Sequence, residues 1–142
     1  QIPGLHKGRK IMVVADEDVA ELRPASPAFA WIYDITDEKC PVPIATMNVE
    51  GFDDGYHPPM TGCHQPSEVF KGTIIPFAWF AQGLRLFDVK DPYAPKEVGY
   101  FVPDTPQGSK RPSANDVTMD SRGLIYMIDR LRGVDVIETS VM

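Results

Sequence analysis

Apolar and polar residues alternate along short segments of this chain, and each segment is followed by a turn rich in proline, glycine or aspartate. Residues 84–89 read Leu-Arg-Leu-Phe-Asp-Val, and residues 96–102 carry a second run of strand-forming side chains after two prolines. Proline removes a backbone donor and restricts the residue before it, so a helix cannot connect the two runs. The stretch 83–101 therefore predicts a β-hairpin with its turn between Asp88 and Asp91.

The hairpin pattern recurs along the chain. Residues 31–45 align with it at an offset of 54 residues, and residues 133–138 align with its first strand at an offset of 50. An active site is needed only once, so aspartates that recur in successive copies favour a structural role. We predict that the turn aspartates accept hydrogen bonds from nearby backbone N–H groups. They are Asp34, Asp37, Asp88 and Asp91.

Strand patterns that recur about every 50 residues without a helical period are typical of β-propeller blades. The prediction is an all-β chain of about three four-stranded blades, at residues 1–50, 60–103 and 113–142, of which the last is incomplete. Pro-rich loops at 51–60 and 103–112 lie between them. Propellers close with ~4–8 blades, so three would leave apolar faces in water. We therefore expect a C-terminal part of a larger propeller, or a subunit whose ring is closed by remaining blades or a second chain.

Other strands are predicted from shorter runs. Segment 113–119 aligns with residues 64–70 of the segment 61–70, and we predict a strand in each segment. Residues 73–81 predict a strand in which Pro76 indicates a bulge or a sheet edge, because proline cannot donate to the ladder. We expect Trp79 and Phe80 to pack between blades.

Two longer segments carry a family resemblance. The runs GLRLFDVKDPYAPKEVGYF and NDVTMDSRGLIYMIDRLRGVDVIE resemble the LVIVD repeat of β-propeller proteins that are mostly bacterial and often exported. This resemblance covers nearly all of the chain outside the Pro-rich loops, and it implies a binding or interaction scaffold that is periplasmic or extracellular. More distantly, the repeat is similar to selenium-binding protein and methanethiol oxidase propellers, whose copper site is built from histidines. That similarity implies the alternative of a metal-dependent, oxidoreductase-like enzyme.

Composition and motifs narrow the function classes. The net charge of −6 argues against nucleic acid, which binds basic surfaces. The apolar run at 73–81 is far shorter than the ~20 residues of a membrane-spanning helix. The motifs of serine hydrolases, zincins and phosphate-binding loops do not occur. Cys40 and Cys63 allow either one disulfide or two thiols, and we favour a buried Cys63 over a reactive one.

Polar side chains near the innermost strands of a propeller converge on its axis, where such proteins build their sites. Imidazole and carboxylate groups suit a copper, zinc or iron ion, and His64 and Glu68 are the predicted ligands, with His57 and Cys63 nearby in the sequence. The predicted residues at the channel mouth are Asp16, Glu17, Asn115 and Asp116.

Each of these residues also has a structural interpretation. His64 can bond the protein instead of a metal ion, and Glu68 can pair with Arg122 or Arg130. For Asp129, Arg130 and Arg132 we favour an ion pair between blades over a place at the channel mouth. The two function hypotheses differ at one atom. A metal enzyme needs a His64 ring nitrogen ~2–3 Å from a point shared with other ligands, whereas in a scaffold His64 is hydrogen-bonded to the protein.

Overall fold

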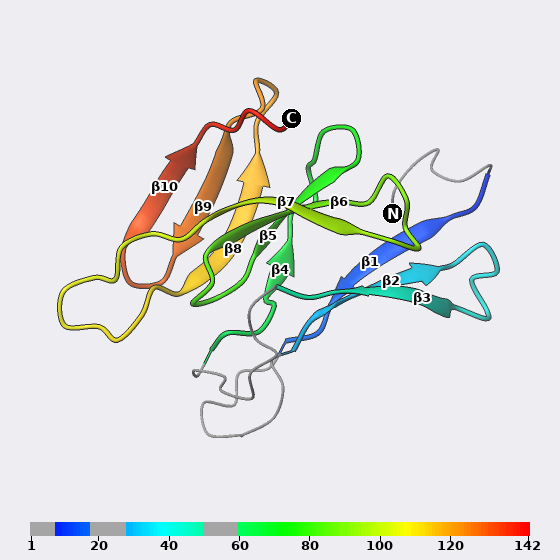
Figure 1. Ribbon diagram of the computed structural model, residues 1–142, viewed down its shortest axis with the longest axis horizontal. Helices are drawn as coiled ribbons and strands as arrows, with labels where there is room; N and C mark the ends of the chain where they lie inside the picture. The colour runs from blue at the N-terminus through cyan, green and yellow to red at the C-terminus, as the bar shows by residue number, and fades with distance from the viewer. Residues whose placement is uncertain (1–7, 18–27, 50–59) are drawn as a thin grey trace.

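The computed structural model describes residues 8–17, 28–49 and 60–142, which form three small antiparallel sheets (Figure 1). The first sheet contains β1 (Ile11–Ala15), β2 (Ala30–Asp34) and β3 (Val42–Met47) in that order. The middle sheet contains β4 (Gln65–Pro66), β5 (Ile74–Ala78), β6 (Leu84–Asp88) and β7 (Lys96–Phe101). The last sheet contains β8 (Ala114–Met119), β9 (Ile125–Asp129) and β10 (Gly133–Ile137), with β10 and β8 at its edges.

The all-β prediction is confirmed, and no helix occurs in the described ranges. Each sheet lies within one of the three predicted segments. The loop predicted at 103–112 carries no strand, whereas the loop predicted at 51–60 lies outside the described residues except for Met60. In the described part of the chain, the middle sheet has the expected four strands, whereas the first and last sheets have three each.

The two predicted hairpins are confirmed, and they share the same irregularity. In β2–β3 the register shifts between Ile32 and Tyr33, and in β6–β7 it shifts between Leu86 and Phe87, each 54 residues further on. A bulge of this kind bends the strand and increases its twist. The two hairpins therefore have the same shape as well as the same sequence pattern.

The turn aspartates of both hairpins bind the backbone as predicted. Asp34 Oδ1 accepts the N–H of Thr36 at 2.9 Å, and Asp88 Oδ1 accepts the N–H of Lys90 at the same distance. Asp37 and Asp91 each accept the N–H two residues further on, at 3.0 and 3.1 Å. Such bonds stabilise a tight turn from within, so these four residues are structural.

Pro76 lies in an interior strand, contrary to the expected bulge or edge. Strand β5 pairs with β4 on one side and with β6 on the other, and its register with β6 is regular. The carbonyl of Pro76 accepts the N–H of Ser67 at 2.8 Å, so the missing N–H of this residue faces the β4 side. Because the β4 ladder ends at Pro66, the missing donor costs the sheet little there.

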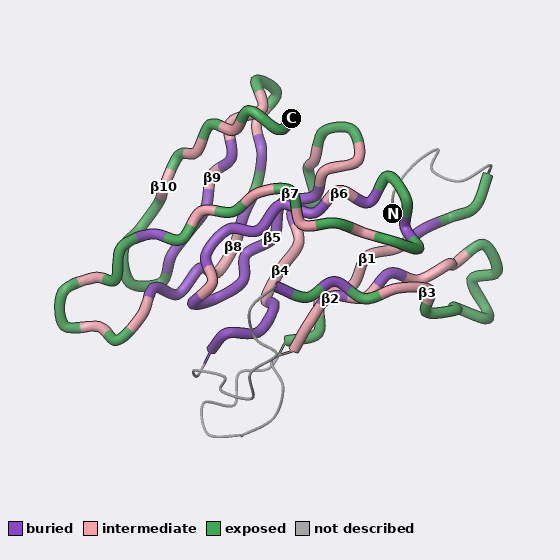
Figure 2. Tube along the Cα trace, in the orientation of Figure 1, coloured by how far each residue is buried: buried purple, intermediate pink, exposed green. Residues whose placement is uncertain are grey.

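Two apolar cores lie between neighbouring sheets. Side chains of a strand point alternately to opposite faces of its sheet. On β6, Phe87 belongs to the core against the first sheet, and Leu84 and Leu86 belong to the core against the last sheet. Figure 2 shows the result, since buried positions are concentrated on β5, β6, β8 and β9.

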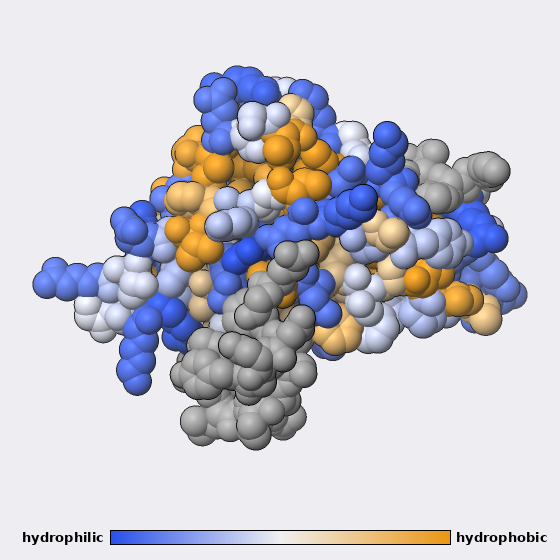
Figure 3. Space-filling model, in the orientation of Figure 1, coloured by the Kyte–Doolittle hydropathy of each residue, from blue (hydrophilic) through white to orange (hydrophobic). Residues whose placement is uncertain are grey.

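The last sheet also has an exposed apolar side. Ile128 on β9 and Val134 and Val136 on β10 are between 46% and 61% exposed. In the space-filling view, hydrophobic side chains gather over β9, β10 and the C-terminal residues (Figure 3).

Gly83 and Gly133 offer a matched test of the packing at the start of β6 and β10. Both have positive φ, which costs any other residue about 1–2 kcal/mol. A Cβ at Gly83 would lie 2.2 Å from the carbonyl oxygen of Phe101 on β7, whereas a Cβ at Gly133 meets nothing within 4 Å. We expect Gly133→Ala to lower the free energy of unfolding by about 1–2 kcal/mol and Gly83→Ala by at least about 2 kcal/mol more.

Urea unfolding followed by the fluorescence of Trp31 and Trp79 measures both losses. Equal losses would contradict the close approach of β7 to Gly83.

Candidate functional site

Polar side chains from the three sheets lie close together at one end of β1, β4 and β8. Arg130 lies at its centre, where Nη2 donates to His64 Nε2 at 3.0 Å and Nε donates to Asn115 Oδ1 at 2.5 Å. Glu17 Oε1 lies 3.6 Å from His64 Nε2. Glu17 follows β1, His64 precedes β4, Asn115 lies in β8 and Arg130 follows β9. These four residues are called the axis-end network below.

The ring of Phe80 packs against two side chains of this network, His64 and Arg130. Its ring centroid is 4.5 Å from that of His64 and 5.3 Å from the guanidinium carbon of Arg130, a cation–π distance. Phe80 is fully buried and has a φ of 38°, which is strained for a residue other than glycine. Backbone bonds hold it there, because its carbonyl accepts the N–H groups of Gly83 and Ala114 at 3.1 and 2.9 Å. Strain of this kind persists where the surroundings fix the residue, and it concentrates at functional sites.

The same positions of successive sheets build this site. Glu17, Phe80 and Arg130 each lie two residues after an equivalent position of the cross-strand register, and these positions are Ala15, Ala78 and Ile128. His64 and Asn115 correspond in the same way at the start of β4 and β8. A bulge in β8 between Ala114 and Asp116 sets the position of Asn115.

Arg130 is the residue that sequence reasoning placed wrongly. The ion pair that we favoured between blades is not formed, because Asp129 instead accepts three backbone N–H groups, from Ser113, Leu131 and Arg132. Arg132 pairs with Asp135 of its own sheet at 3.3 Å. The 50-residue offset that aligns Gly133 with Gly83 also aligns Arg130 with Phe80, but Phe80 was itself expected between blades, so this alignment did not place Arg130 at the axis end.

The chemistry of the network follows from its donors and acceptors. A guanidinium group only donates, so Nε2 of His64 is the acceptor in their bond and its lone pair is in use. The second ring nitrogen, Nδ1, is buried and has no hydrogen-bond partner among the residues that the structure describes. Arg130 and Glu17 are exposed, and Nη1 of Arg130 has no partner among the described residues. The site therefore offers a small ligand both a cation and a carboxylate.

The other predicted residues lie outside the network. Glu68 is exposed beyond the far end of β4 and forms no ion pair with a described residue, while Arg122 pairs with Asp120 at 2.7 Å. Asp116 Oδ1 accepts the adjacent N–H of Val117 at 2.7 Å. Asp16 is exposed and its N–H donates to Phe29.

The predicted metal ion on His64 and Glu68 stays a prediction. In the ranges that the structure describes, no three His, Cys, Asp or Glu side chains come together as metal ligands would. His64 and Glu68 flank β4 on opposite sides, so they do not fit one shared ion. His57 lies outside the described residues.

Both cysteines are free thiols in different surroundings. Cys40 is exposed on the β2–β3 turn, and Cys63 is fully buried in the first core. Burial raises the pKa of the Cys63 thiol far above its usual range, and the carboxylate of Asp16 raises it further. The predicted burial of Cys63 is confirmed, and a thiol in this state is unreactive.

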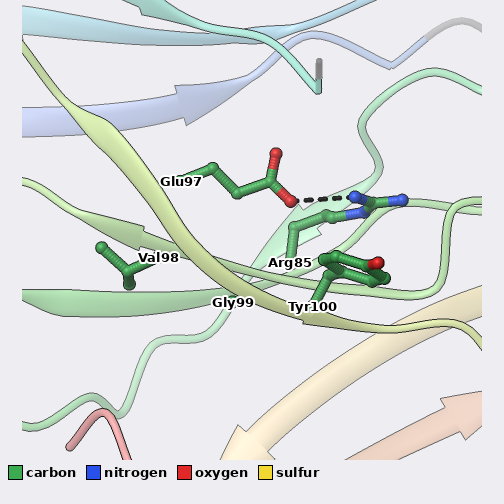
Figure 4. Close-up of a pocket in the computed structure, with 5 residues that line it drawn as sticks. All are labelled: Arg85, Glu97, Val98, Gly99 and Tyr100. Atoms are coloured by element: carbon green, nitrogen blue, oxygen red, sulfur yellow. Dashed lines mark hydrogen bonds and ion pairs between the residues drawn. The ribbon is translucent and has the colours of Figure 1, made fainter. Parts of the chain in front are cut away.

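A pocket of about 500 Å³ on β6 and β7 contains a second polar group (Figure 4). Arg85 Nη1 donates to Glu97 at 2.8 Å, and its other nitrogens donate to the carbonyl and side-chain oxygens of Gln82 at 2.9 Å. The guanidinium also lies 4.8 Å from the ring centroid of Tyr100. Both charged side chains of the pair are mostly buried, so we assign this group a structural role. The alternating strand pattern gave no signal for it.

The chain matches no protein-family model, and no curated protein is significantly similar to it. The described ranges also contain no helix with the length and hydrophobicity that a bilayer crossing needs.

The two thiols should differ sharply toward a disulfide reagent. We expect the native chain to release one equivalent of thionitrobenzoate at pH 8, from Cys40, and two equivalents in denaturant, because only the thiolate of an accessible cysteine reacts. The Cys40→Ser variant should release none until it unfolds. Rapid reaction of this folded variant would show that Cys63 is accessible.

Proposed function

We propose that this chain is a β-propeller segment of the LVIVD-repeat type, and that it serves as a binding scaffold of an exported protein. The order of the sheets supports this proposal. Strand β1 contacts β4, and β5 contacts β8, so two strands at equivalent register positions each lie beside the first strand of the next sheet. Blades arranged around a common axis have this relation.

The axis-end network is the observation that carries the binding function. It draws residues from all three sheets to one end of their strands, where propellers bind ligands. The bond between His64 and Arg130 is the arrangement that the scaffold hypothesis requires of His64.

The ligand class follows from the exposed groups of the network. Arg130 presents a guanidinium whose free Nη1 suits an anionic oxygen, since charge-assisted bonds of arginine to carboxylate or phosphate are among the stronger ones. Glu17, whose Oε1 lies 3.6 Å from the same ring nitrogen of His64, can accept a hydrogen bond from a hydroxyl or an amine. We therefore assign the site to a small polar ligand with an anionic group. The metal-enzyme alternative gains no support from the separated His64 and Glu68.

Thermal unfolding with added sodium phosphate or sodium acetate tests the site, with ionic strength held constant by sodium chloride. We expect whichever of the two anions binds more tightly to raise the midpoint temperature of unfolding of the wild type, and this rise should level off as the site fills. Arg130→Gln should weaken this effect at least tenfold, whereas Arg122→Gln removes an exposed guanidinium that is bound to Asp120 and should leave it unchanged.

Three results count against the proposed site. The first is equal stabilisation of the wild type and Arg130→Gln, which would place anion binding elsewhere. The second is the absence of any saturable effect. The third is stabilisation by zinc or copper that is lost in both His64→Ala and Glu68→Gln, which would favour the metal enzyme.

A further inference from the structure

The two cores between sheets follow one rule. In each core, one face of a sheet meets the opposite face of the next sheet. The middle sheet presents Ile75, Phe77 and Phe87 to the first sheet. It presents Ala78, Leu84 and Leu86 to the last sheet. We call the face that carries Phe77 and Phe87 the receiving face of a sheet, and the face that carries Leu84 and Leu86 its inserting face.

The last sheet has an inserting face that no other sheet of the described residues covers. Val134 and Val136 align with Leu84 and Leu86 at the offset of 50 residues, and Ile128 pairs with Val134 as Ala78 pairs with Leu84. In the middle sheet these positions are at most 3% exposed, but in the last sheet they are 46–61% exposed. Exposed apolar faces of this kind mark interaction surfaces.

The adjacent edge of β10 is also open. Gly83 lies against Phe101 of β7, whereas the equivalent Gly133 has no atom within 4 Å of a built Cβ. No strand pairs with the outer edge of β10 in the described part of the chain (Figure 1).

The first sheet has the complementary face. Met12, Val14 and Tyr33 occupy the register positions of Ile75, Phe77 and Phe87, so they form a receiving face. Trp31 and Tyr33 place two rings there, with centroids 6.1 Å apart. All of these side chains are only partly buried. The two ends of the molecule thus carry the two halves of the contact that the chain makes twice within itself.

We propose that the inserting face of the last sheet binds the receiving face of the first sheet in a second copy of this chain. Such a contact is head-to-tail, and two copies would bring six sheets together, within the ~4–8 blades of closed propellers. The inference rests on the proposed propeller arrangement, but the ligand site at Arg130 has no part in it. Failure of anion binding and failure of association are therefore separate results.

Sedimentation equilibrium of the full chain over a range of concentrations tests this contact. We expect the wild type to associate to twice the monomer mass of 15.8 kDa. The double substitution Val134→Lys and Val136→Lys on the inserting face should weaken association at least tenfold. Met12→Lys on the receiving face should do the same, and Val69→Lys changes a valine that is 51% exposed in a turn and should have no effect.

Mixing the two defective variants distinguishes the head-to-tail contact from a symmetric one. The Met12→Lys variant keeps its inserting face, and the variant with Val134→Lys and Val136→Lys keeps its receiving face. A heterodimer of the two variants should therefore form through this one intact contact. Circular dichroism first checks that both variants are folded. A monomeric wild type would overturn the proposal, and so would association that survives the β10 substitutions or a mixture that stays monomeric.

Discussion

Burial of apolar side chains between neighbouring sheets is the interaction on which this structure depends. A sheet of three or four short strands is not stable unless it covers an apolar face. The middle sheet covers both of its faces, with Phe77 and Phe87 on one side and Leu84 and Leu86 on the other. Each such side chain contributes roughly 1.5–3 kcal/mol when it is fully buried. The sheets therefore stabilise one another, and a sheet at either end keeps one face that the described chain does not fill.

The hairpin turns stabilise each sheet locally, and together with the bulges they set the shape of the faces that pack. Asp34 and Asp88 bind backbone N–H groups two residues away, and the bulges at Ile32 and Leu86 give both hairpins the same bend. Because the hairpins are equivalent, their faces are equivalent too, and neighbouring sheets pack in the same way in both cores. Local hydrogen bonds set the shape of each sheet, and burial sets the order in which the sheets stack.

The axis-end network is a consequence of that order. Glu17, Phe80 and Arg130 occupy equivalent positions in three sheets, yet they are an acid, an aromatic ring and a base. Repetition of the backbone places them together, and divergence of their side chains produces a site with two charges around His64. The strained backbone of Phe80 is held by bonds to Gly83 and Ala114, so the sheets that create the site also fix its geometry.

The sequence by itself determined the strands, the hairpins and the role of the turn aspartates. Those features depend on residues only a few positions apart, whose alternation and turn chemistry can be read directly. It also placed Glu17, His64 and Asn115 at one end of the strands, because equivalent positions in a repeated fold converge. The same reasoning included Asp16, Glu68 and Asp116, which lie outside the network.

The tertiary structure alone decided the partner of Arg130, the separation of Glu68 from the site and the interior place of Pro76. His64 and Arg130 are 66 residues apart, so their contact depends on how whole sheets pack. The place of Pro76 depends on where the β4 ladder ends. Such long-range geometry follows from the packing of complete faces, and no local pattern in the chain encodes it.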